Sequence, residues 1–236
     1  MAHPTRPGPR PRLPRLSADT WETVFGIAYL VAMTNLMLVL GALPLVLLLI
    51  TTDPVSSWPA LAVAGVAATP AVTAAFAVFR ANTLARDAGV VRTFWQAWAR
   101  HLRRSLAIGA LLISTAVVLA VDVVAISGTR PGAVLTPLLV VLFVLAAVTA
   151  LLALVASVER PDARLREVLK ASLYLGVRRW YLTIVSLITL SLLAGLFSLH
   201  PALALGLAAT PLLYAAWANS RYTLGPVLPR GAAVAI

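Results

Sequence analysis

The chain has 236 residues, of which 61% are hydrophobic and only 11% are charged, and its mean hydropathy is +0.93. Soluble domains have about half apolar and about a quarter charged residues, so this composition excludes an ordinary soluble protein. The net charge of +11 lies in segments that border long apolar runs. Because anionic lipid headgroups attract such segments, we expect a lipid bilayer as a partner and no nucleic acid.

The residue types that carry most enzyme and metal chemistry are scarce. The chain has no cysteine, which excludes disulfides, thiolate metal sites and thiol nucleophiles. Its three histidines, His3, His101 and His200, are far apart in sequence, and no cluster with metal-ligand spacing surrounds them. P-loop, GxSxG and HExxH motifs do not occur either. We therefore expect a non-enzymatic protein without catalytic residues, cofactor or metal site.

Six apolar runs follow a Pro/Arg-rich start. We expect residues 1–20 to form a disordered basic tail, residues 21–228 an all-α transmembrane domain of six helices, and residues 229–236 a short C-terminal tail. A membrane-spanning helix needs about 20 apolar residues, and each run is near that length. The predicted spans are Val24–Ile50, Pro59–Phe79, Ser105–Ile126, Gly132–Val158, Trp180–Leu199 and Ala202–Ala218.

The Lys and Arg residues indicate the topology of these spans. All 19 except Arg130 lie in the N-terminal segment, in the loops after spans two and four, or beyond span six. Because cationic residues resist translocation, we expect these segments and both termini to be cytoplasmic. The Arg, Ala and Val content, with a single Lys, is typical of a GC-rich bacterial genome. The sequence thus predicts a multi-pass protein of a bacterial cytoplasmic membrane.

The two longer inner loops have helical periodicity. In Arg92–Arg104 apolar residues recur at every fourth position opposite a row of Arg and Gln, and Arg164–Arg178 has a similar apolar stripe opposite cationic residues. These patterns predict two amphipathic helices in the inner interface of the membrane. Such helices either dock a cytoplasmic partner or simply lie on lipid between two spans. The candidate partner or lipid contacts are Phe94, Trp95, Trp98, Arg100, Arg103, Arg104, Arg178 and Arg179.

Spans two and six share a pattern that includes a proline and an arginine. The segment Thr69–Arg80 (TPAVTAAFAVFR) matches Thr210–Arg221 (TPLLYAAWANSR) in the Thr-Pro pair, two alanines, an aromatic residue, a further alanine and the final Arg. Pro-interrupted helices in matching positions point to a transporter binding site, so Pro70 and Pro211 are candidate hinges. The alternative is chance similarity, because Thr, Pro and Ala are common in membrane helices.

A few polar side chains are predicted at membrane depth. Asn35 lies near the middle of span one, where its amide needs a partner from another helix or from a substrate. Asp122 lies toward the outer end of span three, where we expect it to be hydrated or paired with Arg130. Asn219, at the inner end of span six, is predicted to cap its helix. Pro44 is a further hinge candidate in span one.

Short motifs along the chain resemble those of a bacterial family. The first span contains TNLMLVLGALPLVLLL, the second PAVTAAFAVFR, the next segment FWQAWARHLRRSL, and the last span YAAWANSRY. Together they are similar to the YesL-type membrane proteins, a family filed as domain of unknown function 624, over about Trp21 to Leu228. The resemblance implies a polytopic membrane protein, often associated with carbohydrate ABC-transport systems, without established catalytic residues.

On this basis we expect an accessory or regulatory role in ABC-type carbohydrate transport. The cytoplasmic face would contact permease or ATPase subunits. The alternative is a transport module in its own right, with Pro-kinked helices that line a substrate cavity.

Overall fold

The computed structural model describes residues 18–84, 89–200 and 203–227, and every regular element in them is helical. This confirms the predicted all-α class. The predicted tails fall mainly outside the described residues, and the first helix begins at Ala18. The elements are α1 (Ala18–Gly41), α2 (Leu43–Thr51), α3 (Trp58–Leu84), α4 (Val90–Ile126), α5 (Arg130–Glu159), α6 (Leu165–Arg178), α7 (Trp180–Leu199), the π-helical turn η1 (Ala204–Ala208), α9 (Ala209–Leu224) and the 3-10 turn η2 (Gly225–Val227).

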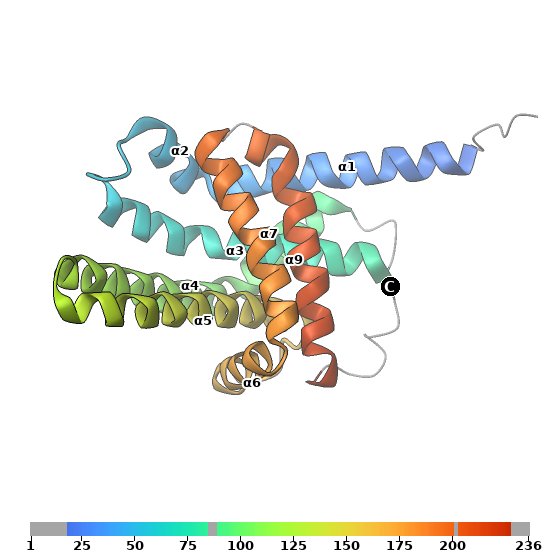
Figure 1. Cartoon of the computed structure of the whole chain (residues 1–236). Helices are drawn as coiled ribbons and strands as arrows, with labels where there is room; N and C mark the ends of the chain where they lie inside the picture. The colour runs from blue at the N-terminus through green and yellow to red at the C-terminus, as the bar shows by residue number, and fades with distance from the viewer. Residues whose placement is uncertain (1–17, 85–88, 201–202, 228–236) are drawn as a thin grey trace, which may run out of the picture.

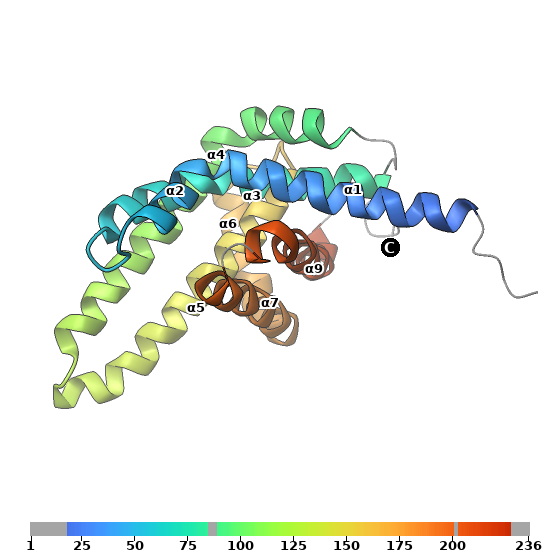
Figure 2. The same cartoon turned by 90° about the horizontal axis from the view of Figure 1, so that it is seen from above.

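The helices form two groups that cross each other. α1 and α3 run along each other, and α4 and α5 form a hairpin whose closed end extends away from the other helices (Figures 1 and 2). α7 and α9 form a second pair, which runs steeply across α1 and α3 (Figure 1). The short helix α6 lies at one end of this pair, next to the α4–α5 hairpin.

Five helices are long and apolar enough to cross a membrane. They are α1 over Thr20–Gly41, together with α3, α4, α5 and α7 over their full lengths. These helices support the predicted class of multi-pass membrane protein. The sixth predicted span corresponds to η1 and α9, which are not among the five. A sixth crossing and a cytoplasmic position for both termini therefore stay predictions.

The first predicted span is divided into two helices. α1 ends at Gly41, α2 begins at Leu43, and Pro44 lies in the first turn of α2. Proline lacks an N–H donor and its ring clashes with the carbonyl four residues earlier, so it can begin a helix but does not continue one. The predicted span Val24–Ile50 therefore consists of two helices, and the break lies next to the hinge candidate Pro44.

α4 joins two elements that were predicted separately. The interfacial helix Arg92–Arg104 and the span Ser105–Ile126 form one helix of 37 residues. They join because the buried stripe runs on without a break between them. Its residues, three or four positions apart, are Val90, Phe94, Ala97, His101, Ser105 and Ile108. The helix changes direction along its length, so its first turns and its hairpin portion point in different directions (Figure 2).

Small residues bring α3 close to its neighbours. A Cβ atom placed on Gly109 of α4 would lie 2.2 Å from the Oγ1 atom of Thr69, and one on Gly41 would lie 2.9 Å from the Cβ atom of Ala71. Lipid gives apolar helices little hydrophobic reason to associate, so close backbone approach and van der Waals packing provide the attraction. The glycines at these two positions therefore set the spacing of α1, α3 and α4.

α5 is buried only along its second half. Every residue from Ala150 to Glu159 is buried, whereas most of the first half is exposed. The buried half lies where α3, α6, α7 and α9 meet α5, and the exposed half belongs to the projecting end of the hairpin. The C-terminal end of α5 is thus the centre of the fold.

Candidate functional site

A buried ion cluster lies at the C-terminal end of α5. The carboxylate of Glu159, whose side chain is 1% exposed, is 3.5 Å from Nε of Arg80 through Oε2 and 3.1 Å from Nε of Arg221 through Oε1. Arg80 comes from α3 and Arg221 from α9, so one carboxylate joins three helices. A buried carboxylate needs such partners, because an unpaired charge away from water carries a large desolvation cost.

The two arginines are the equivalent residues of the matching segments in spans two and six. Arg80 ends Thr69–Arg80 and Arg221 ends Thr210–Arg221. The match in sequence therefore has a counterpart in space, because both arginines bind the same carboxyl group. Glu159 was not predicted as a site residue, since it falls one position beyond the expected end of span four. A carboxylate directly after a long apolar run was the signal that could have found it.

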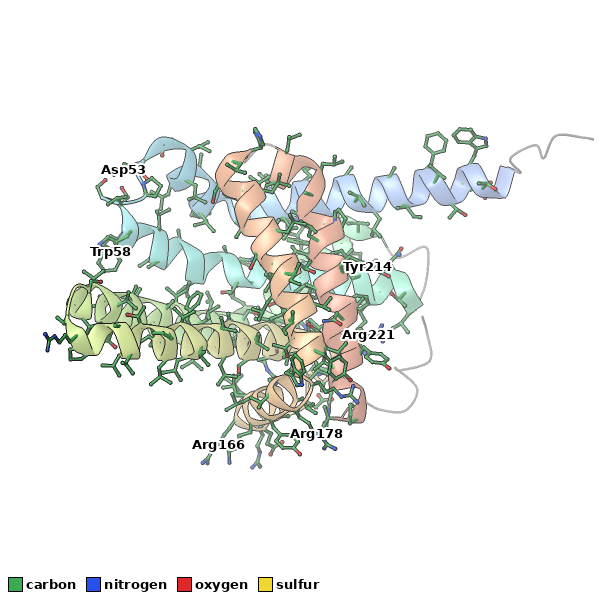
Figure 3. All side chains as sticks on the ribbon, viewed as in Figure 1. Asp53, Trp58, Arg166, Arg178, Tyr214 and Arg221 are labelled. Carbon is green, nitrogen blue, oxygen red and sulfur yellow. The ribbon has the colours of Figure 1, made fainter. Side chains whose placement is uncertain are left out.

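Further contacts fix the two guanidinium groups. Arg80 donates a hydrogen bond from Nη1 to the carbonyl oxygen of Val158 at 2.9 Å. The Cζ atom of Arg221 lies 4.8 Å from the ring centroid of Trp217, a cation–π distance. Trp217 and Tyr214 in turn pack against Phe79 of α3, with centroid distances of 5.9 and 5.4 Å. Aromatic rings therefore fill the contact between α3 and α9 beside the cluster, and Figure 3 labels Tyr214 and Arg221 there.

Asn35 forms a second polar junction. Its Nδ2 atom donates to the carbonyl oxygen of Gly206 at 2.8 Å, and its Oδ1 atom accepts from the backbone N–H of Thr210 at 2.9 Å and from the Thr210 hydroxyl at 2.7 Å. Thr210 N–H and Gly206 C=O are the donor and acceptor that pair in a regular α-helix. Gly206 lies within the π-helical turn η1, Thr210 lies at the start of α9, and Pro211 follows. The Asn35 amide thus satisfies backbone groups at an irregular point of the helix, which is the helix-packing alternative.

The other intramembrane candidates have more ordinary surroundings. Asn219 does not cap α9 but donates to the Leu182 carbonyl at 2.6 Å and the Ser186 hydroxyl at 2.7 Å, which joins α9 to α7. Asp122 is exposed and forms no ion pair with Arg130, a residue the structure also describes. Pro70 is buried within α3.

The residues predicted to contact partners or lipid divide into internal and external groups. Phe94 is fully buried and Trp98 is half-buried against the core, so neither forms an open surface. Arg104 donates to the carbonyl of Pro161 at 3.0 Å and Arg179 to that of Tyr222 at 2.7 Å. These two half-buried arginines therefore connect segments within the protein.

The external group lies mainly on the first turns of α4. Trp95 is 39% exposed, and the side chains of Arg92, Gln96, Arg100 and Arg103 are exposed around it. We call these five residues the α4 outer face. Within the described ranges, its arginines form no ion pair with a carboxylate. Their charge is therefore available to a partner or to lipid.

An apolar groove of about 250 Å³ lies between α4 and α5. Residues between Ile108 and Thr115 of α4 and between Leu142 and Ala150 of α5 form its sides, and Leu169 and Leu173 of α6 complete the lining. Pro70 and Pro211, the hinge candidates for a transport cavity, do not line this groove.

Comparison with family models finds a match, whereas comparison with curated proteins and with solved structures finds none. The matching model is described as "Protein of unknown function, DUF624" and covers residues 30–123. These residues run from within α1, through α2 and α3, to near the end of α4. This segment is similar to the family that the motifs of the chain resemble, the YesL-type membrane proteins of DUF624.

Proposed function

We propose that this chain is a non-enzymatic membrane protein that contacts a permease or ATPase subunit of an ABC-type carbohydrate transport system through its cytoplasmic face, and that it assists or regulates transport. The observation that carries the proposal is the α4 outer face. It presents three arginines and a half-exposed tryptophan on a helix whose opposite side is built into the core. The carbohydrate context is supported by the family resemblance alone.

The α4 outer face has the physical properties of a docking surface. Phe94, Ala97 and His101 fasten the same turns to the protein interior, so the exposed side chains are held on a rigid support. A partner that binds there orders little additional backbone, which lowers the entropic cost of association. Arginine and tryptophan are also the residue types that contribute most to protein interfaces.

The helices proposed to form a transport cavity, α3 and α9, support a role as an independent transport module less well than the α4 outer face supports an accessory role. Transport of a sugar requires polar groups around a water-accessible space near the matching prolines. The rings of Phe79, Tyr214 and Trp217 instead occupy the contact between α3 and α9. We therefore favour the accessory role.

The test is affinity purification of the full chain from its native membrane in a mild detergent. We expect recovery of an ABC permease or its ATPase, and we expect the charge-reversal variant Arg100→Glu/Arg103→Glu to reduce that recovery by about tenfold or more, since like charges across an interface repel. The matched control is Arg130→Glu at the start of α5, which should have no effect.

Two outcomes would contradict the proposal. One is recovery of the wild-type protein alone, with sugar uptake by the cell unchanged when the gene is deleted. The other is sugar flux into liposomes that contain only this protein, which would favour the transport-module alternative.

A further inference from the structure

We propose that the groove between α4 and α5 is a binding site for one anionic phospholipid. An acyl chain would lie in the groove, and the phosphate would lie beside Lys170 and Arg178 of α6. The site lies away from the α4 outer face, so it goes beyond the proposed function.

The residues that line the groove are suited to bind a hydrocarbon chain. Its polar side chains are Thr115 and Thr149, and both hydroxyls donate to carbonyls of their own helices, to Leu111 at 2.8 Å and to Leu145 at 2.7 Å. With its hydroxyls already bonded, the groove offers no free donor to a sugar or another polar ligand. The remaining lining residues are aliphatic, so an alkyl chain is the ligand that fits their chemistry.

A cationic hollow on α6 continues from this groove. Leu173 lines both, and the other residues of the hollow are Lys170, Tyr174, Val177 and Arg178. A phospholipid has a hydrocarbon chain followed by a phosphate, and the apolar groove followed by two cations matches both parts. The complementarity of charge therefore selects an anionic lipid among the possible occupants of the groove.

The cations of the hollow are available to a ligand. Nη1 of Arg178 donates to the Tyr174 hydroxyl at 3.2 Å, and its Cζ atom lies 5.9 Å from the Tyr174 ring centroid, so the guanidinium group is held in place. Lys170 is exposed and, like Arg178, forms no ion pair in the part of the chain that the structure describes. Figure 3 shows Arg178 directed away from the helices, where a headgroup would lie.

The depth of the groove agrees with a lipid of the inner leaflet. Under the predicted topology, α4 runs outward after Ser105 and α5 runs inward toward Glu159. The lining segment of α4 and most of that of α5 then fall in the inner half of the bilayer, and α6 lies at the cytoplasmic interface next to them. The acyl chain would then lie in the hydrocarbon layer and the phosphate in the headgroup layer, as in a lipid of the surrounding leaflet.

The test is native mass spectrometry of the full chain in detergent with phosphatidylglycerol or phosphatidylcholine of identical acyl chains. We expect preferential retention of one phosphatidylglycerol. Each cation near an anionic surface contributes about 1 kcal/mol, so Lys170→Gln/Arg178→Gln should weaken phosphatidylglycerol binding roughly thirtyfold. Phosphatidylcholine binding should weaken much less, because its choline offsets the charge of its phosphate. The matched control is Arg166→Gln, which removes a charge from α6 outside both linings.

Filling the groove tests the acyl-chain half of the proposal. Ala146→Phe should weaken retention of both lipids, and Thr115→Phe fills the same groove from α4 if the first variant does not fold. Equal retention of the two lipids, or an effect of Arg166→Gln as large as that of the double variant, would show general attraction to lipid and overturn the site. So would a dimer of this chain that the filling variants dissociate, because a second copy would then occupy the groove.

Discussion

At the scale of single residues, Glu159 is the side chain on which the junction of α3, α5 and α9 depends. A buried ion cluster adds little stability as a whole, because pairing must first offset the desolvation of each charge. Removal of the carboxylate is costly, because it takes the counter-charge from the Arg221 side chain, which is only 8% exposed, whereas the Arg80 side chain, at 38%, stays partly hydrated. The loss of stability should therefore be large when one charged group is removed and small when apolar residues replace all three.

We therefore expect Glu159→Gln to reduce stability by roughly 3–5 kcal/mol, while the triple replacement Arg80→Met/Glu159→Leu/Arg221→Met recovers most of that loss. The measurement is the temperature at which half the protein stays monodisperse on size-exclusion chromatography after heating in detergent. Glu167→Gln, which removes an exposed carboxylate from α6, is the control and should change nothing. A triple variant as unstable as Glu159→Gln would show that the charges are needed for more than mutual compensation.

Asn35 gives a second prediction at this scale. Asn35→Leu leaves the Thr210 N–H and the Gly206 carbonyl without the side chain that binds both, so we expect a loss of about 1–3 kcal/mol. Thr210→Val removes only the hydroxyl donor and should cost about 0.6 kcal/mol, the usual value of one interhelical bond. The same thermal assay compares them. Equal losses would mean that the backbone bonds of Asn35 contribute nothing.

At the scale of elements, the sequence predicted where several helices begin and end but not how they join. Hydropathy located α7 at Trp180–Leu199 and α5 within two residues, because lipid demands long apolar helices whatever their neighbours are. It separated Arg92–Arg104 from the next span, since Arg103 and Arg104 look like an interfacial boundary. The two segments nevertheless form one helix, because the side opposite these arginines is buried along both of them. That burial depends on tertiary contacts, which no local sequence pattern shows.

The same reasoning explains which site residues could be predicted. Asn35 was identified because an amide at mid-membrane must find a partner in any fold. Its partners, Gly206 and Thr210, were not identified, because they lie at a π-helical turn that hydropathy does not reveal. The arginines of the matching segments were visible in sequence, but their common partner Glu159 became evident only when α3, α5 and α9 were placed together.

The packing of α3 on α4 provides a prediction for these elements. Gly109→Ala would place a Cβ atom 2.2 Å from Oγ1 and 2.9 Å from Cγ2 of Thr69, so the helices must move apart. We expect a loss of about 1–3 kcal/mol, the usual cost of an overpacked core. Thr69→Ala removes both nearest atoms, so the double variant should regain part of the stability. Gly26→Ala, which meets no atom within 4 Å, is the control, and a Gly109→Ala protein as stable as wild type would contradict the close contact.

At the scale of the whole molecule, the contacts at the end of α9 bear on the number of membrane crossings. Arg221 of α9 binds Glu159 of α5, and Nη1 of Arg160 donates to the carbonyl of Val227 at 3.0 Å. The C-terminal ends of α5 and α9 therefore lie side by side and must face the same compartment. Because α7 leads away from that end and η1 returns toward it, the predicted sixth crossing follows if α7 spans the bilayer.

Cysteine labelling from outside the cell tests this arrangement directly, because the native chain has no cysteine of its own. Single cysteines at Ser56 and His200 should react with a membrane-impermeant maleimide, whereas those at Arg164 and Pro226 should react only after the membrane is permeabilised; all four positions are exposed. Permeabilised cells control for the reactivity of each thiol. Labelling of the cysteine at Pro226 but not of the one at Arg164 in intact cells would place the C-terminal ends of α5 and α9 on opposite sides of the membrane. That result would contradict both the Glu159–Arg221 ion pair and the six-span topology. Labelling of neither His200 nor Pro226 would instead mean that α7 and α9 enter the membrane from the inner side without crossing it.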